Sequence, residues 1–240
     1  FSLIGSTYTI LYMLMRKILH TTLLEYLFVS TIFVLATIQF TWSYYDAFFW
    51  YNGAMYYTLF YSFSLLLGSL LICYQQTSSL IKKWGIGAFS ICLAIIIAGG
   101  NFVSGLGIGA ILFTSIILMR LEQKKWSYFN IVILVIYGIS FATSVLAPGN
   151  TYRQITVVDQ PNIIVAFFMA IGKSFEFLAD SFNIVQILVI AILAPVIIRL
   201  ARASRFKFSH PWICLLLTTL LYSSFFFAHC YAMGSRGPGR

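Results

Sequence analysis

The sequence predicts an all-α fold: a polytopic bundle of transmembrane helices. Hydrophobic residues make up 60% of the 240-residue chain and charged residues only 9%, whereas about a quarter of a soluble domain is charged. Such a chain has too little polar surface to cover its apolar side chains in water, so we expect lipid around it. The apolar residues also form segments of membrane length, and helices satisfy their own backbone groups in lipid.

We expect about eight spanning helices, because a helix needs about 20 apolar residues to cross a bilayer. The segments are 1–15, 23–42, 54–74, 84–100, 105–119, 127–147, 183–198 and 212–233. We expect them to form a single transmembrane domain over residues 1–240, as part of a longer chain, since the sequence starts without Met and ends inside a Gly/Arg motif.

Basic residues between these segments predict the orientation. The formal net charge is +9, and most Lys and Arg residues fall in four separators. These are Arg16/Lys17, Lys82/Lys83, Arg120/Lys124/Lys125 and Arg199/Arg202/Arg205/Lys207. We attribute this bias to cytoplasmic loops of a membrane protein, and therefore expect no nucleic-acid partner. The outer face then holds 43–53, 101–104, 148–162 and the tail after Met233.

The segment 163–182 is long enough to span but carries Lys173, Glu176 and Asp180. If it spanned, the arginine-rich 199–207 loop would lie outside, so we expect an interfacial or re-entrant helix. The three charges share one helix face at spacings of three and four. That face is either solvated or lines a cavity.

The glycines of "GLGIGA" (105–110) open an expected spanning helix. No strand precedes them, which argues against a phosphate-binding loop. We expect these small residues to allow close helix packing. Pro195 is expected to kink the helix over 183–198, as membrane helices tolerate.

The first outer loop, Trp42 to Tyr57, contains Asp46, Trp50, Tyr51 and Asn52 around an expected Asn-Gly turn. Asp46 is the one acid between Glu25 and Glu122, and ionisable groups at the membrane are candidates for function. It could act as a general base, a metal ligand or an acceptor for a substrate hydroxyl. The alternatives are a solvated loop aspartate and an interfacial belt of aromatic residues.

Two further outer segments place arginines after Gly/Pro turns. "APGNTYR" contains Asn150 and Arg153, and "GSRGPGR" contains Arg236 and Arg240. The planar guanidinium suits phosphate oxygens, and free backbone N–H groups in turns can face an anion. The alternative is a helix stop with a snorkelling arginine.

His229 precedes Arg236 by seven residues in the last apolar segment. A histidine there either takes part in substrate binding and acid–base chemistry or simply hydrogen-bonds across helices.

The "APGN" turn (147–150) with Arg153, "YNGAMYY" (51–57) and the helix pattern give the chain a resemblance to a family. It resembles bacterial GT-C-like membrane glycosyltransferases, in particular the polytopic membrane proteins of the DUF6056 group. The resemblance implies sugar transfer from a polyprenyl-phosphate donor to a surface glycan or lipid acceptor, at the outer face of the bacterial plasma membrane. It covers most of the chain loosely.

The resemblance also suggests roles. Such enzymes usually place a catalytic acid on the first outer loop after their first helix, so either Asp46 serves or the acid lies outside this sequence. The three outer arginines would hold the donor phosphate, Asn52 and Asn150 would orient oxygens, and Trp50 and Tyr51 would stack on sugar or prenyl chain. Some such enzymes use a divalent metal, but a single acid predicts no metal cage built from protein ligands alone.

Other classes of function remain open. A transporter or flippase for a lipid-linked glycan would use the same arginines without chemistry. A glycan polymerase or ligase would differ mainly in its acceptor, and a structural membrane protein would need none of these residues.

Overall fold

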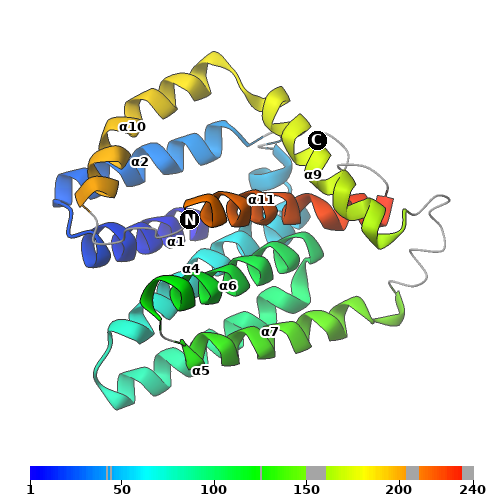
Figure 1. Ribbon diagram of the computed structural model, residues 1–240, viewed down its shortest axis with the longest axis horizontal. Coiled ribbons are helices and arrows are strands. Elements are labelled where there is room, and N and C mark those ends of the chain that lie inside the picture. Colours follow the sequence, from blue (N-terminus) through cyan, green and yellow to red (C-terminus); the bar gives the residue numbers. More distant parts are fainter. Residues whose placement is uncertain (42, 44, 125, 150–160, 204–210, 234–240) are drawn as a thin grey trace. The chain divides into compact units, whose positions relative to one another are not determined.

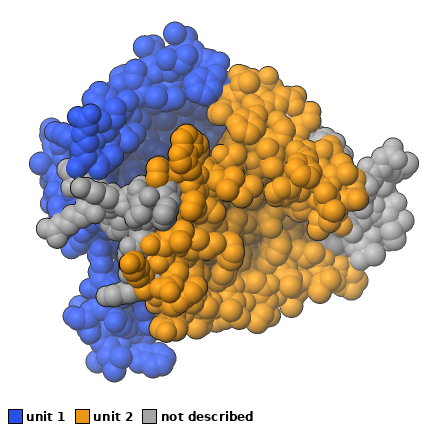
Figure 2. Space-filling model, in the orientation of Figure 1, with its two compact units in different colours: residues 1–89, 181–207, 240 blue, residues 90–180, 208–239 orange. Residues whose placement is uncertain are grey.

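The computed structural model describes residues 1–41, 43, 45–124, 126–149, 161–203 and 211–233 (Figure 1). Helices dominate this described part, and no strand occurs in it. The predicted all-α fold is therefore confirmed. The described residues divide into two compact units (Figure 2): those of 1–89 and 181–203 belong to unit 1, and those of 90–180 and 211–233 belong to unit 2.

The helical elements of unit 1 are α1 (Ser2–Leu11), η1 (Tyr12–Ile18), α2 (Leu23–Gln39), η2 (Tyr45–Phe49), α3 (Tyr51–Gly53), η3 (Ala54–Thr58), α4 (Leu59–Gln76), the first part of α5 (Leu80–Gly100) and α10 (Ile184–Ala203). From α1 to α4, they alternate between α-helix and π-helical turns. α10 continues through Pro195 as one helix.

In unit 1, α1 and α4 run in the same direction, and α2 runs opposite to them. Ser62 Oγ lies 3.4 Å from Ser2 Oγ near the start of α1, and Ile10 contacts Gly68 further along. Tyr8 of α1 hydrogen-bonds Thr31 at 2.8 Å. Consequently one end of unit 1 carries residues 12–22 and 76–83, and the opposite end carries the chain start and residues 40–58.

The side-chain core between α1 and α2 also positions α10. Met15, Tyr26 and Val29 form a buried cluster, against which Leu193 and Val196 of α10 pack. The C-terminal turns of α10 therefore lie at the end of unit 1 that carries residues 12–22.

Unit 2 contains the rest of α5, α6 (Phe102–Gln123), α7 (Tyr128–Val145), α9 (Ile163–Ser181) up to Asp180, and α11 (Pro211–Met233). Serine hydroxyls of α7 donate to backbone carbonyls of α5, at 3.0 Å for Ser140 to Ile95 and 3.1 Å for Ser144 to Gly99. These bonds satisfy polar groups between helices, as lipid requires.

The glycines of α6 give its neighbours room. A Cβ on Gly105 would lie 2.9 Å from the Phe141 ring of α7, and one on Gly107 would lie 2.2 Å from the Phe225 ring of α11. Tyr137 donates a 2.8 Å hydrogen bond to the Gly105 carbonyl. The predicted role of these small residues in close helix packing is confirmed.

Helix length and hydropathy indicate an integral membrane protein, although the expected count of eight spans is not confirmed. Within the described residues, five helices are long and apolar enough to span: Tyr51–Gln76, Leu80–Gly100, Phe102–Leu121, Tyr128–Val145 and Pro211–Tyr231. A sixth span results if α9 and α10 form one broken helix. The first two expected spans are too short as single α-helices, because α1 has 10 residues before η1 and α2 has 17.

Candidate functional site

Residues 43–58, which we name the Asp46 segment, connect α2 to α4 through η2, α3 and η3. The Trp50 N–H donates to the Tyr45 carbonyl at 2.9 Å, and the Ala54 N–H to the Trp50 carbonyl at 2.8 Å. Thr58 Oγ1 donates to the Ala47 carbonyl at 2.5 Å, which folds the segment back on itself. π-helical turns are rare and frequently occur at functional sites.

The Asp46 carboxylate is half-buried and accepts a 2.8 Å hydrogen bond from Ser43 Oγ. The backbone of Asp46 is also tightly packed, because a Cβ on Gly53 would lie 1.9 Å from the Asp46 carbonyl oxygen. Gly53 has a helical φ of −65°. The expected Asn-Gly turn is therefore wrong: Asn52 and Gly53 lie in α3, and glycine is needed there for close backbone approach rather than for a positive φ.

Aromatic rings of the Asp46 segment are largely exposed. Trp50 is 48% and Tyr51 74% exposed, and Asn52 beside them is also exposed. Tyr45 and Phe49 stack on each other with ring centroids 6.5 Å apart. Such rings suit both an interfacial belt and a surface on which a sugar stacks.

The structure brings together four of the predicted site residues: Asp46, Trp50, Tyr51 and Asn52. His229 lies half-buried in α11 of unit 2. The other four predicted site residues lie outside the described residues. They are Asn150, Arg153, Arg236 and Arg240. Their proposed phosphate contacts therefore stay predictions.

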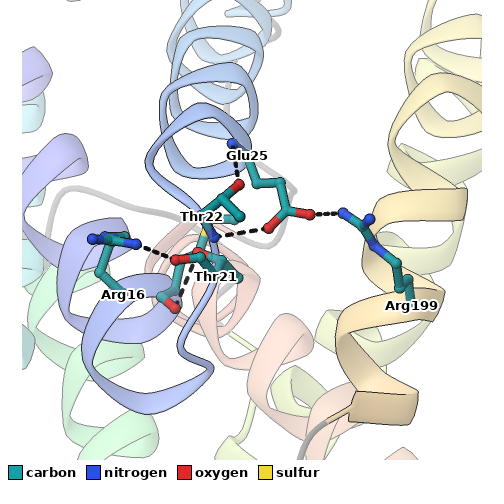
Figure 3. A network of polar contacts seen from close by, with 6 residues as sticks. Arg16, Thr21, Thr22, Glu25 and Arg199 are labelled. Atoms are coloured by element: carbon teal, nitrogen blue, oxygen red, sulfur yellow. Dashed lines mark hydrogen bonds and ion pairs between the residues drawn. The ribbon is translucent and has the colours of Figure 1, made fainter.

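A second polar group, which we name the Glu25 network, consists of Arg16, Thr21, Thr22, Glu25 and Arg199 (Figure 3). It lies at the end of unit 1 opposite Asp46. Thr22 Oγ1 accepts the Glu25 N–H at 3.3 Å, and the Thr22 N–H donates to Glu25 Oε2 at 2.9 Å. The other carboxylate oxygen, Oε1, forms an ion pair with Arg199 of α10. Arg16 donates to the Thr21 carbonyl. The acid thus caps α2 and links it to α10.

The Glu25 network was not among the predicted sites. Its local half has a sequence signal, because Thr22 and Glu25 have the spacing of a capping box. Its other half joins residues 174 positions apart, for which the sequence holds no local signal.

Most basic residues of unit 1 lie at the end that carries the Glu25 network. They are Arg16, Lys17, Lys82, Lys83, Arg199 and Arg202. Asp46 lies at the opposite end. This separation agrees with the orientation inferred from the sequence, with the basic end at the cytoplasmic face and the Asp46 segment outside.

On α9, Lys173 and Glu176 form an ion pair of 2.6 Å, with side chains 37% and 46% exposed. The prediction that these residues share a face is confirmed. The surroundings of this face and the interfacial placement of α9 stay predictions.

Two observations bear on ligand chemistry. Within the described residues, no group of three or more His, Cys, Asp or Glu side chains could hold a metal ion. Unit 2 contains an apolar pocket of about 410 Å³ between α6, α7, α9 and α11, which is open to the surface and is lined among others by Gly109, Tyr137 and Phe227.

Comparisons with protein-family models, curated proteins and solved structures found no match to this chain.

Proposed function

We propose that this protein is a membrane glycosyltransferase, which moves a sugar from a polyprenyl-phosphate donor to a glycan or lipid acceptor at the outer face of a bacterial plasma membrane. The observation that carries the proposal is the Asp46 carboxylate, held by Ser43 among exposed aromatic residues at the end of unit 1 opposite the basic residues. A carboxylate in such a place suits base chemistry on a sugar hydroxyl.

In the proposed reaction, Asp46 removes the proton of the acceptor hydroxyl as its oxygen attacks the anomeric carbon. The bond from that carbon to the donor phosphate oxygen breaks, and polyprenyl phosphate leaves with the electron pair. Arg153, Arg236 and Arg240 are assigned to the negative charge that develops on the leaving phosphate. Asn52 and Asn150 are assigned to orient oxygens, His229 to substrate contact, and Trp50 and Tyr51 to stacking on the sugar.

A flippase or transporter for a lipid-linked glycan is the second candidate, and one observation favours it. α9 and α10 together are long and apolar enough for one span but are interrupted at residues 182–183. Discontinuous helices often form the substrate sites of transporters.

The test is sugar transfer from a radiolabelled polyprenyl-phosphate sugar by the full protein in membranes. Asp46→Asn is expected to reduce transfer by about 10²- to 10⁴-fold, the usual contribution of a general base. Arg153→Ala should also reduce transfer, through weaker phosphate binding. The matched control is Glu25→Gln, which neutralises the other acid of unit 1 and keeps a capping residue.

Three outcomes decide between the candidates. Loss of transfer in Asp46→Asn and Arg153→Ala, but not in Glu25→Gln, supports the glycosyltransferase. Full transfer by Asp46→Asn removes Asp46 as the base. Absence of transfer in wild type, combined with lipid binding that Arg153→Ala abolishes, favours the transporter.

A further inference from the structure

We propose that the basic end of unit 1 holds an anionic phospholipid of the bilayer, with its phosphate at Arg199 and Arg202 and one acyl chain in the groove between α2 and α10. The proposal does not rest on the proposed enzyme activity. It concerns the end of unit 1 opposite the Asp46 segment.

The groove provides the place for the chain. It has a volume of about 590 Å³, is open to the surface, and is lined by Val196 of α10 and by six residues of α2: Leu24, Glu25, Leu27, Phe28, Thr31 and Ile32. The residues from Leu24 to Ile32 cover about 12 Å along α2 at 1.5 Å per residue. Leu24, Leu27 and Phe28 are exposed, and in a membrane protein such side chains contact hydrocarbon. The groove is therefore an apolar slot that starts at the charged end.

The rim of the groove provides the charge. Glu25 lines the groove, and Arg199 is joined to it by the ion pair (Figure 3). The Arg199 side chain is still 61% exposed, and a guanidinium has five N–H donors, more than one carboxylate oxygen uses. Arg202 is also exposed and follows at a spacing of three, so both guanidinium groups lie on neighbouring positions of α10.

Charge complementarity identifies the occupant. Among the described residues of this end, six Lys and Arg side chains accompany one acid, Glu25. Both carboxylate oxygens of Glu25 are already bonded, one to the Thr22 N–H of the helix cap and the other to Arg199. The remaining net charge of this end is positive, and it lies beside the apolar groove, which opens to the bilayer. Basic pockets between membrane helices at the cytoplasmic side bind anionic head groups. A phosphatidylglycerol-like lipid offers both the phosphate and the chain.

The Glu25 ion pair has a defined part in this site. It fixes the Arg199 guanidinium at the mouth of the groove, where a phosphate oxygen can accept the remaining N–H donors. Removing the acid frees the guanidinium but keeps its charge. We therefore expect the arginines to be required for lipid binding, whereas Glu25 only orients Arg199.

The test is native mass spectrometry of the full chain in detergent, titrated with dioleoyl phosphatidylglycerol or with dioleoyl phosphatidylcholine. Wild type is expected to retain phosphatidylglycerol in preference. The double variant Arg199→Gln/Arg202→Gln should bind it about 25-fold more weakly, from the usual contribution of each basic residue near an anionic lipid. The matched control Lys82→Gln/Lys83→Gln removes the same charge from α5, outside the groove lining, and should retain nearly all binding.

Two further measurements distinguish lipid binding from a structural effect of the substitutions. Glu25→Gln breaks the same ion pair and should retain phosphatidylglycerol; equal loss in Glu25→Gln would show that the arginines act only by holding α10, and would overturn the proposal. Dihexanoyl phosphatidylglycerol has the head group without long chains and should bind at least about tenfold more weakly.

Three other results would overturn the site. They are equal loss in the two double variants, absence of any preference over phosphatidylcholine, and equal binding of the short-chain and long-chain lipids. The first would leave only diffuse electrostatic attraction, the second would remove recognition of the lipid's negative charge, and the third would remove the groove from the site.

Discussion

Unit 1 contains two acids, Glu25 and Asp46, and its two ends hold them in different ways. Glu25 caps α2 and pairs with Arg199, so both carboxylate oxygens serve the fold. Asp46 accepts a hydrogen bond from Ser43, and no ion pair to it occurs within the described part of the chain. The comparison separates an acid committed to structure from an acid available for chemistry.

The largest expected effect comes from Gly53→Ala, which would disrupt the packing of the Asp46 segment. The new Cβ would lie 1.9 Å from the Asp46 carbonyl oxygen, so backbone must move. We expect a loss of stability on the order of 3 kcal/mol, together with loss of sugar transfer. Thermal unfolding in detergent and the transfer assay measure the two effects.

Gly85→Ala is the matched control, because a Cβ there meets nothing within 4 Å. It should leave stability unchanged or raise it by up to about 1 kcal/mol, the propensity gain of alanine in a helix. Unchanged unfolding of Gly53→Ala would mean that the close approach does not constrain the segment.

Ser43→Ala sharpens the comparison at the same end. It removes the donor to the Asp46 carboxylate, a bond expected to contribute about 1.5 kcal/mol because its acceptor is charged. Transfer should fall as the carboxylate loses its orientation, and Ser43→Thr should recover part of it. Ser64→Ala, which removes a hydroxyl bonded to its own helix, is the control. Equal activity of both alanine variants would contradict this role of Ser43.

Thr22→Ala tests the structural role of the Glu25 end. Loss of the N-cap should cost about 1 kcal/mol in thermal unfolding and leave transfer unaffected. Thr22→Ser should restore stability. Thr37→Ala, within the same helix, removes a methyl group and a hydroxyl that is bonded to the Phe33 carbonyl of its own helix, and should have little effect. A larger loss in Thr37→Ala than in Thr22→Ala would contradict the importance of the cap.

The smallest effect is expected for Arg199→Gln. The arginine is largely exposed, so the ion pair should contribute about 0.2 to 1 kcal/mol. A double-mutant cycle with Glu25→Gln, measured by thermal unfolding at low and high salt, isolates this coupling. The coupling should decrease at high salt, because ions screen exposed charges. A coupling that salt does not change would show that the pair is shielded from solvent.

Much of the fold could be predicted because the apolar segments have membrane length and end at basic residues or at turns. The helices over 84–100, 127–147 and 212–233 have counterparts in α5, α7 and α11. Close helix packing at the glycines of 105–110 could also be predicted, because small residues let neighbouring helices approach. The number of spans was harder to predict, since hydropathy does not show where an apolar stretch changes into π-helical turns, as at Tyr12.

The site was predictable only in part. Asp46 stands out by its isolation in the sequence, but the closeness of Gly53 to its carbonyl depends on three-dimensional packing. An Asn-Gly pair usually marks a turn, and here tertiary contact overrode that preference. The Arg199–Glu25 pair was not predictable, because helices that are apolar on most sides give no periodic signal for their lateral neighbours.

The contact of Phe225 with Gly107 has a consequence for biosynthesis. The glycine is made first, and roughly a hundred residues follow before its phenylalanine partner emerges, a delay on the order of ten seconds at usual rates of synthesis. During that time the space beside Gly107 on α6 lacks the Phe225 ring that fills it in the folded protein. The packing between α6 and α11 is therefore completed only after α11, the last helix of unit 2, has been synthesised.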